Sequence, residues 1–81
     1  MDLQTRMNHI IKVLNSSNQE LTAKDVVSMY IFEFTTSDIL TTGTILNVMY
    51  HLDLVKKISY RKGKSIRYRF RRLGNNLIRV T

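Results

Sequence analysis

Hydrophobic residues recur at three- and four-residue steps over the first 53 positions, which is the spacing of amphipathic helices. The three helices that this spacing predicts span about 2–16, 23–33 and 38–53. Short polar runs at 15–18 and 35–37 separate them, and Thr22 with Asp25 forms a capping-box pattern before the second. The first helix carries an apolar stripe that is expected to serve the core and a partner helix of a dimer together, made of Leu3, Met7, Ile10, Ile11 and Leu14. In the second helix, the residues assigned to the core are Val26, Val27, Tyr30, Ile31 and Phe34.

The predicted third helix has two contrasting faces. At 100° per residue, one side gathers apolar residues that we assign to the core, namely Ile45, Val48, Met49 and Leu52. The opposite side is small and polar, apart from one leucine and one tyrosine ring, and it carries no acidic residue. Its members are Gly43, Leu46, Asn47 and Tyr50, flanked by Thr44 and His51. We therefore expect this side to be a surface that faces a partner.

The hydrophobic period changes to two near residue 55, which predicts a β-hairpin over about 55–72 with Gly63 in its turn. The second strand of this hairpin has one apolar face and one basic face, made of Ile66, Tyr68 and Phe70 against Arg67, Arg69 and Arg71. We assign the apolar face to the core.

The chain of 81 residues is expected to form a single α+β domain over 1–81. The tail over 73–81 is a turn followed by an apolar segment, Leu77, Ile78 and Val80. Three interpretations stay open for this segment: a third strand, a dimer contact or a frayed end.

Charge is divided unequally along the chain. Residues 1–53 hold three basic and six acidic residues, a net charge of −3, whereas residues 54–81 hold ten basic residues and no acidic one. Such a division creates a one-sided positive field, which favours a polyanionic partner over a mere solubility role. Nucleic acid is the partner that we expect.

Three helices followed by a basic hairpin is the element order of a winged helix-turn-helix domain with a basic C-terminal wing. The stretches that carry this resemblance are 21–27, 44–55 and the hairpin. Within that family, the spacing is similar to the DNA-binding half of ferric uptake regulators, and Gly63-Lys64-Ser65 resembles their wing. Where those regulators have Thr-Val-Tyr-Arg, this chain has Thr41-Thr42-Gly43-Thr44, and it lacks their metal-sensing dimerisation half. The resemblance thus implies a fold and a DNA-facing surface, without metal sensing or a base preference.

Two groups of residues are predicted to touch DNA. Directional hydrogen-bonding groups on the third helix would read bases in the major groove, and hairpin cations would contact phosphates or a minor groove. The helix candidates are Thr41, Thr42, Gly43, Thr44, Asn47, Tyr50 and His51. The wing candidates are Lys56, Lys57, Arg61, Lys62, Lys64, Arg67, Arg69 and Arg71.

Several kinds of chemistry are not expected. The chain has no cysteine, so disulfides, thiolate metal sites and cysteine nucleophiles are excluded. His9 and His51 lack acidic neighbours at ligand spacing, and three scattered glycines cannot form a phosphate-binding loop. We predict no enzymatic activity, metal, cofactor, small-molecule ligand or membrane association.

The function that we expect is a small sequence-specific regulator of transcription that binds double-stranded DNA as a homodimer. The expected location is cytoplasmic, at the nucleoid, and stand-alone modules of this kind are typical of phage and plasmid regulators. The alternative is a winged-helix adaptor that binds RNA or an acidic protein. Solvent exposure of Tyr68 and Phe70 would favour RNA, because aromatic platforms stack on unpaired bases.

Overall fold

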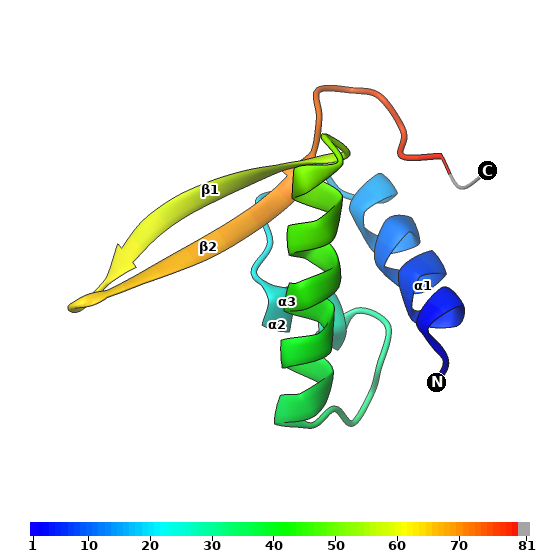
Figure 1. The fold of residues 1–81 in the computed structure, drawn as a ribbon, viewed down its shortest axis with the longest axis horizontal. Helices are drawn as coiled ribbons and strands as arrows, with labels where there is room; N and C mark the ends of the chain where they lie inside the picture. The colour runs from blue at the N-terminus through cyan, green and yellow to red at the C-terminus, as the bar shows by residue number, and fades with distance from the viewer. Residues whose placement is uncertain (80–81) are drawn as a thin grey trace.

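The computed structural model describes residues 1–79 and contains three helices followed by an antiparallel two-stranded hairpin. The elements are α1 (Leu3–Asn15), α2 (Ala23–Ser28), α3 (Thr36–His51), β1 (Val55–Lys62) and β2 (Ser65–Arg72). Figure 1 shows α3 through the middle of the molecule, α1 on one side of it and the hairpin extending away on the other. This α+β arrangement confirms the predicted element order and is compatible with a winged-helix layout.

Short polar side chains start each helix. Asp2 caps α1, and capping boxes start α2 and α3. The Thr22–Asp25 box confirms the sequence pattern. The Thr35–Asp38 box was not predicted, and it starts α3 two residues before the expected position.

The second helix is shorter than predicted. It was expected over 23–33, but α2 ends at Ser28 and the chain then crosses to α3 without helical structure. The connection from Tyr30 to Phe34 is rich in aromatic and β-branched residues, which lose rotamer freedom in a helix. The Tyr30 hydroxyl is also hydrogen-bonded to that of Thr42 on α3, and this contact forms from the non-helical connection.

The buried face of α3 differs from the predicted one. Its buried residues are Thr42, Ile45, Leu46 and Met49, a stripe turned by about 60° from the expected one. Val48 and Leu52, assigned to the core, are 47% and 62% exposed, whereas Leu46, assigned to the surface, is fully buried. The prediction was wrong because apolar residues lie around most of this helix, so their spacing does not single out one buried face. The buried polar Thr42 completes the stripe that faces the core.

The core lies where the three helices meet the base of the hairpin. It combines Ile10 and Leu14 from α1, Val26 from α2, Leu46 and Met49 from α3, Val55 and Phe70 from the strands, and Ile78 from the tail. Leu21 and Phe70 also exchange two backbone hydrogen bonds, of 2.8 and 2.7 Å, in an isolated bridge. The base of the hairpin is thereby fixed to the helices.

The outer half of the hairpin projects beyond the helices (Figure 1). A two-residue turn at Gly63-Lys64 closes it, and Gly63 has a φ of 61°, which costs glycine little. Ile66 and Tyr68 were assigned to the core together with Phe70, but they are 58% and 46% exposed. Only the base of the hairpin has helices to pack against, so Phe70 alone of the three is buried.

The tail from Leu73 to Arg79 forms no strand. The Asn15 side-chain amide donates to the carbonyl of Ile78 and accepts from its N–H, both at 2.8 Å, and the Ile78 side chain is buried. This segment therefore covers the end of α1, while Val80, part of the predicted apolar segment, lies outside the described residues.

Two substitutions on α3 test its rotation. Leu46→Ala should lower the free energy of unfolding by about 2–5 kcal/mol, because it leaves a cavity in the core. Val48→Ala, on the exposed side, should lower it by about 0.5 kcal/mol or less. Urea unfolding followed by circular dichroism measures both, and equal effects of the two substitutions would contradict the observed rotation.

Candidate nucleic-acid interface

The hairpin carries cations on both faces. Its strand register pairs Tyr60 with Arg67 and Ile58 with Arg69, so one face holds Lys56, Lys62, Arg67, Arg69 and Arg71. Lys57 and Arg61 lie on the other face. The predicted grouping of three arginines on one side of β2 follows from this register, and the Arg69 guanidinium stacks 4.0 Å from the centre of the Tyr60 ring.

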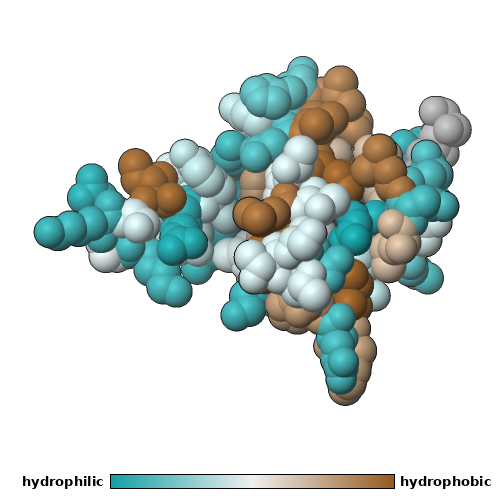
Figure 2. Space-filling model, turned by 60° about the horizontal axis from the view of Figure 1, so that its bottom comes forward, coloured by the Kyte–Doolittle hydropathy of each residue, from teal (hydrophilic) through white to brown (hydrophobic). Residues whose placement is uncertain are grey.

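Most of these cations are open to solvent and lack an acidic partner. Among residues 1–79 the one ion pair joins Arg6 to Asp38, far in sequence from the hairpin. The exposed hairpin cations are Lys56, Arg61, Lys62, Lys64 and Arg67, while Lys57, Arg69 and Arg71 are half-buried. In Figure 2 the projecting hairpin, on the left, is largely hydrophilic apart from a hydrophobic patch. The positive charge of this arm is therefore free to meet an anion.

The outward face of α3 has no cation. Its exposed residues include Leu40, Thr44, Val48 and His51, and Asn47 beside them is half-buried. Figure 2 shows residues of intermediate hydropathy over the middle of this side of the molecule. The face thus offers hydroxyl, amide and methyl groups next to the charged arm.

The seven helix candidates differ in their exposure to solvent. Thr44, Tyr50 and His51 are exposed, and Thr41, Gly43 and Asn47 are half-buried. Gly43 faces α2, where an added Cβ would meet the Cβ of Ala23 at 3.7 Å. Thr42 was wrongly predicted to contact DNA: it is fully buried, because it belongs to the core stripe of α3.

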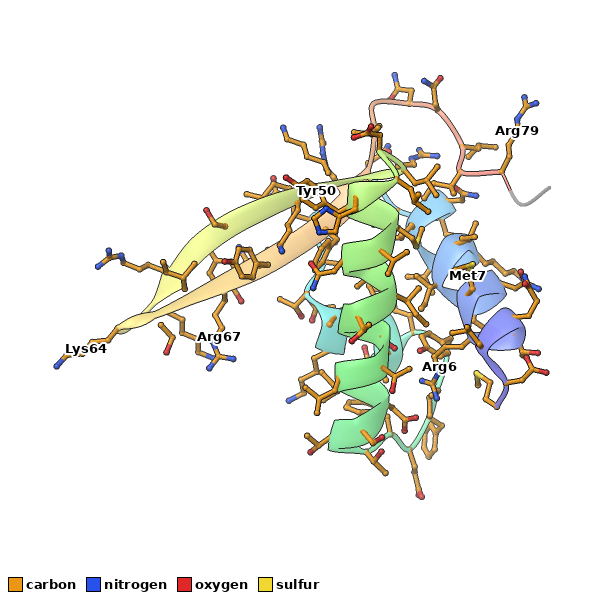
Figure 3. All side chains as sticks on the ribbon, in the orientation of Figure 1. Arg6, Met7, Tyr50, Lys64, Arg67 and Arg79 are labelled. Atoms are coloured by element: carbon orange, nitrogen blue, oxygen red, sulfur yellow. The ribbon has the colours of Figure 1, made fainter. Side chains whose placement is uncertain are left out.

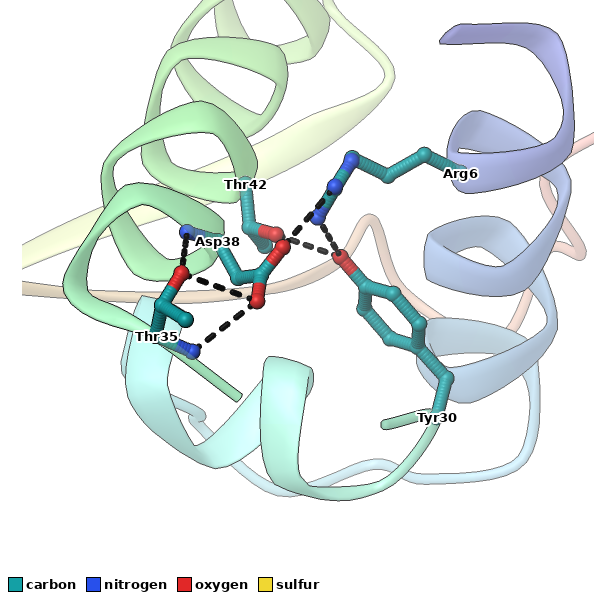
Figure 4. A network of polar contacts seen from close by, with 5 residues as sticks. All are labelled: Arg6, Tyr30, Thr35, Asp38 and Thr42. Atoms are coloured by element: carbon teal, nitrogen blue, oxygen red, sulfur yellow. Dashed lines mark hydrogen bonds and ion pairs between the residues drawn. The ribbon is translucent and has the colours of Figure 1, made fainter. Parts of the chain in front are cut away.

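A polar network fixes the start of α3 (Figure 4). The Arg6 guanidinium donates to Asp38 Oδ1 at 3.0 Å and to the Tyr30 hydroxyl at 3.1 Å, and the Tyr30 hydroxyl is hydrogen-bonded to that of Thr42. The backbone N–H of Thr35 and the Arg6 guanidinium hold the pKa of the Asp38 carboxyl below its usual value. The network therefore ties α1 and the α2–α3 connection to α3.

A second cluster joins α3 to the hairpin. Lys57 Nζ donates to Asn47 Oδ1 at 2.8 Å and lies 4.2 Å from the centre of the Tyr68 ring and 5.5 Å from that of Tyr50. Figure 3 shows Tyr50 at the junction of α3 with the hairpin, and Arg67 pointing into the angle between the two. This angle is the candidate interface.

A groove of about 290 Å³ continues the candidate interface toward α2. Three cations line it together with Tyr60, namely Lys24, Lys62 and Arg67. Lys24 was not among the predicted contacts, because its sequence surroundings on α2 give no sign that it lies near the hairpin. Leu40 was also missed, although its four-residue step to Thr44 places it on the same face of α3.

Comparisons with known proteins returned no match. Neither family models, nor curated proteins, nor solved structures resemble this chain closely enough to assign it to a family. Within residues 1–79 no helix has the length and apolar composition needed to cross a bilayer. The same residues place no group of three or more histidine or carboxylate side chains together as metal ligands.

The network around Asp38 predicts a pH-dependent stability. Because the folded-state pKa of Asp38 is lowered, its stabilising effect is present above the unfolded-state pKa of about 3.9 and is lost as the pH falls through the folded-state value. Asp38→Asn should therefore lower the thermal midpoint at pH 7, and the gap to the wild type should narrow as the pH falls below about 4.

The control for this measurement is Glu33→Gln, which removes one exposed carboxylate from the preceding connection. It should change the midpoint little at any pH. A gap between Asp38→Asn and the wild type that does not narrow at all as the pH falls below about 4 would show that the carboxylate charge is not what stabilises this region.

Proposed function

We propose that this protein is a small winged-helix protein that binds specific sites in double-stranded DNA and regulates transcription. The observation that carries the proposal is the angle between α3 and the hairpin, in which unpaired cations adjoin a neutral polar helix face. In this arrangement the hairpin serves as a wing on the phosphate backbone, and α3 enters the major groove.

The dimensions of α3 suit this role. Its 16 residues make a rod about 24 Å long, and the major groove of B-DNA is wide enough for an α-helix. Because α3 contains no Lys or Arg, α3 and the hairpin contribute differently to DNA binding. Affinity comes from cations of the wing through release of counterions, and sequence preference comes from the side chains of α3.

A homodimer is part of the proposal, because one module of this size covers little DNA. The apolar stripe of α1 and the apolar tail segment are the candidates for a symmetric contact, but Ile10, Leu14 and Ile78 are buried within the chain. Leu3 and Leu77 stay exposed and are the residues that such a contact would use.

The second candidate is an adaptor that binds RNA or an acidic protein. The sequence pattern assigned Tyr68 and Phe70 to the core, which argued against RNA. Tyr68 is exposed, which favours RNA, whereas Phe70 is buried. A cation lies over a face of each tyrosine ring of the hairpin, Lys57 on Tyr68 and Arg69 on Tyr60. One face of each ring is thus occupied, which leaves less aromatic surface for stacking on unpaired bases.

Titration of duplex DNA and single-stranded RNA at several salt concentrations tests the proposal. If about four to six phosphates are neutralised per subunit, the logarithm of duplex affinity should fall against that of salt with a slope of roughly −4 to −5. Arg61→Ala and Lys62→Ala should each weaken binding to all sequences and flatten the slope by about one.

Lys12→Ala is the matched control, since it removes an exposed cation from α1. It should leave the slope unchanged. Tighter binding of single-stranded RNA than of any duplex would favour the adaptor. Equal effects of Lys12→Ala and Arg61→Ala would show that the wing does not contact the DNA.

A further inference from the structure

The contact between Lys57 and Asn47 fixes the orientation of an amide at the candidate interface. Lys57 Nζ donates to Asn47 Oδ1 at 2.8 Å. An ammonium group has three N–H donors and no acceptor, so the oxygen of the amide must face it and the nitrogen must point away. The chemistry of the pair therefore decides which end of Asn47 is presented.

The presented end of Asn47 reaches solvent. Among residues 1–79, Nε of Arg71 is the one buried side-chain nitrogen or oxygen that lacks a hydrogen-bond partner. Nδ2 of Asn47 makes no hydrogen bond within these residues and is absent from that category, so it is open to solvent. The two amide N–H groups are thus unused within these residues and not sealed from solvent.

Lys57 is held in place before any ligand arrives. Its ammonium lies over the rings of Tyr68 and Tyr50, at 4.2 and 5.5 Å from their centres, within the range of cation–π attraction. Its aliphatic stem is half-buried between α3 and the hairpin. The amide is consequently preorganised, which lowers the entropic cost of binding through it.

We propose that Asn47, oriented by Lys57, selects guanine over adenine in the major groove. This inference rests on the proposed binding of duplex DNA. The pair presents amide N–H donors beside an ammonium charge, and guanine presents two acceptors, N7 and O6. The usual bidentate contact of asparagine with adenine needs the amide oxygen to accept from N6, and the positively charged Lys57 ammonium beside that oxygen disfavours the approach of a second donor. Lys57 is thus a positioning residue and Asn47 the reader.

Selection of bound duplexes from a random pool tests this inference. The wild type should enrich a motif with a guanine that is preferred over adenine by about tenfold, the range of one good base contact. Lys57→Met keeps the apolar stem but removes the ammonium charge beside the amide oxygen, so the same position should shift toward adenine. Lys56→Met removes a neighbouring exposed cation that does not touch Asn47, and it should keep the guanine.

Two more variants separate base selection from a general loss of structure. Lys57→Arg retains a donor-only partner for the amide oxygen and should keep the guanine. Asn47→Asp removes the outward donors and should lose it, even if Lys57→Met fails to fold.

Each other outcome overturns the inference in a distinct way. Equal weakening of all duplexes by Asn47→Asp and Lys57→Met would make the pair a phosphate contact, because phosphate oxygens are also acceptors. A guanine retained in Lys57→Met, or an enriched motif without a guanine, would refute the role of Lys57. If the wild type enriches no duplex at all, the proposed function itself fails.

Discussion

The rotation of α3 about its own axis decides which side chains can meet a ligand. This rotation is set by burial of Thr42, Ile45, Leu46 and Met49 against α1, α2 and the base of the hairpin. Thr42 is the one buried polar residue among residues 1–79, and the Tyr30 hydroxyl satisfies it. An unpaired hydroxyl at that depth would be costly, so the hydrogen bond favours this rotation over others that bury a similar apolar area.

Most cations of the chain lie on the hairpin, an arm that has few contacts beyond its base. The base of the hairpin is fixed by Val55, Phe70 and the bridge to Leu21, whereas its outer half projects into solvent. Cations gathered on such an arm repel one another, and nothing acidic on the arm relieves this repulsion. An anion that lies along the arm relieves it, and a regularly spaced polyanion does so at several positions at once.

The sequence predicted the parts of the fold that local patterns determine. The three helices, the box at Thr22 and the hairpin with Gly63 in its turn depend on neighbouring residues, and they were found. The rotation of α3 depends on a competition between faces, because Leu46 is apolar on one side of the helix and Leu40 and Val48 are apolar on the outward side. No periodicity could settle that competition without the Tyr30–Thr42 contact, which joins two elements through space.

The candidate site was predictable to a similar degree. Cations of the hairpin were identified from their number and alternation, but the exposure of Tyr68 depends on how far the hairpin extends past the helices. The contact of Lys57 with Asn47 also lay outside the reach of sequence patterns, since it joins a helix to a strand across a turn. Such contacts follow from the angle between elements, which composition and spacing do not encode.

The most direct test of duplex binding between α3 and the hairpin is nuclear magnetic resonance of the labelled protein during titration with duplex DNA. If duplex DNA lies between α3 and the hairpin, amide signals of Thr44, Asn47 and His51 should shift together with those of Arg61 and Arg67, while signals of α1 should move little. Shifts confined to the hairpin, or centred on α1, would contradict the account.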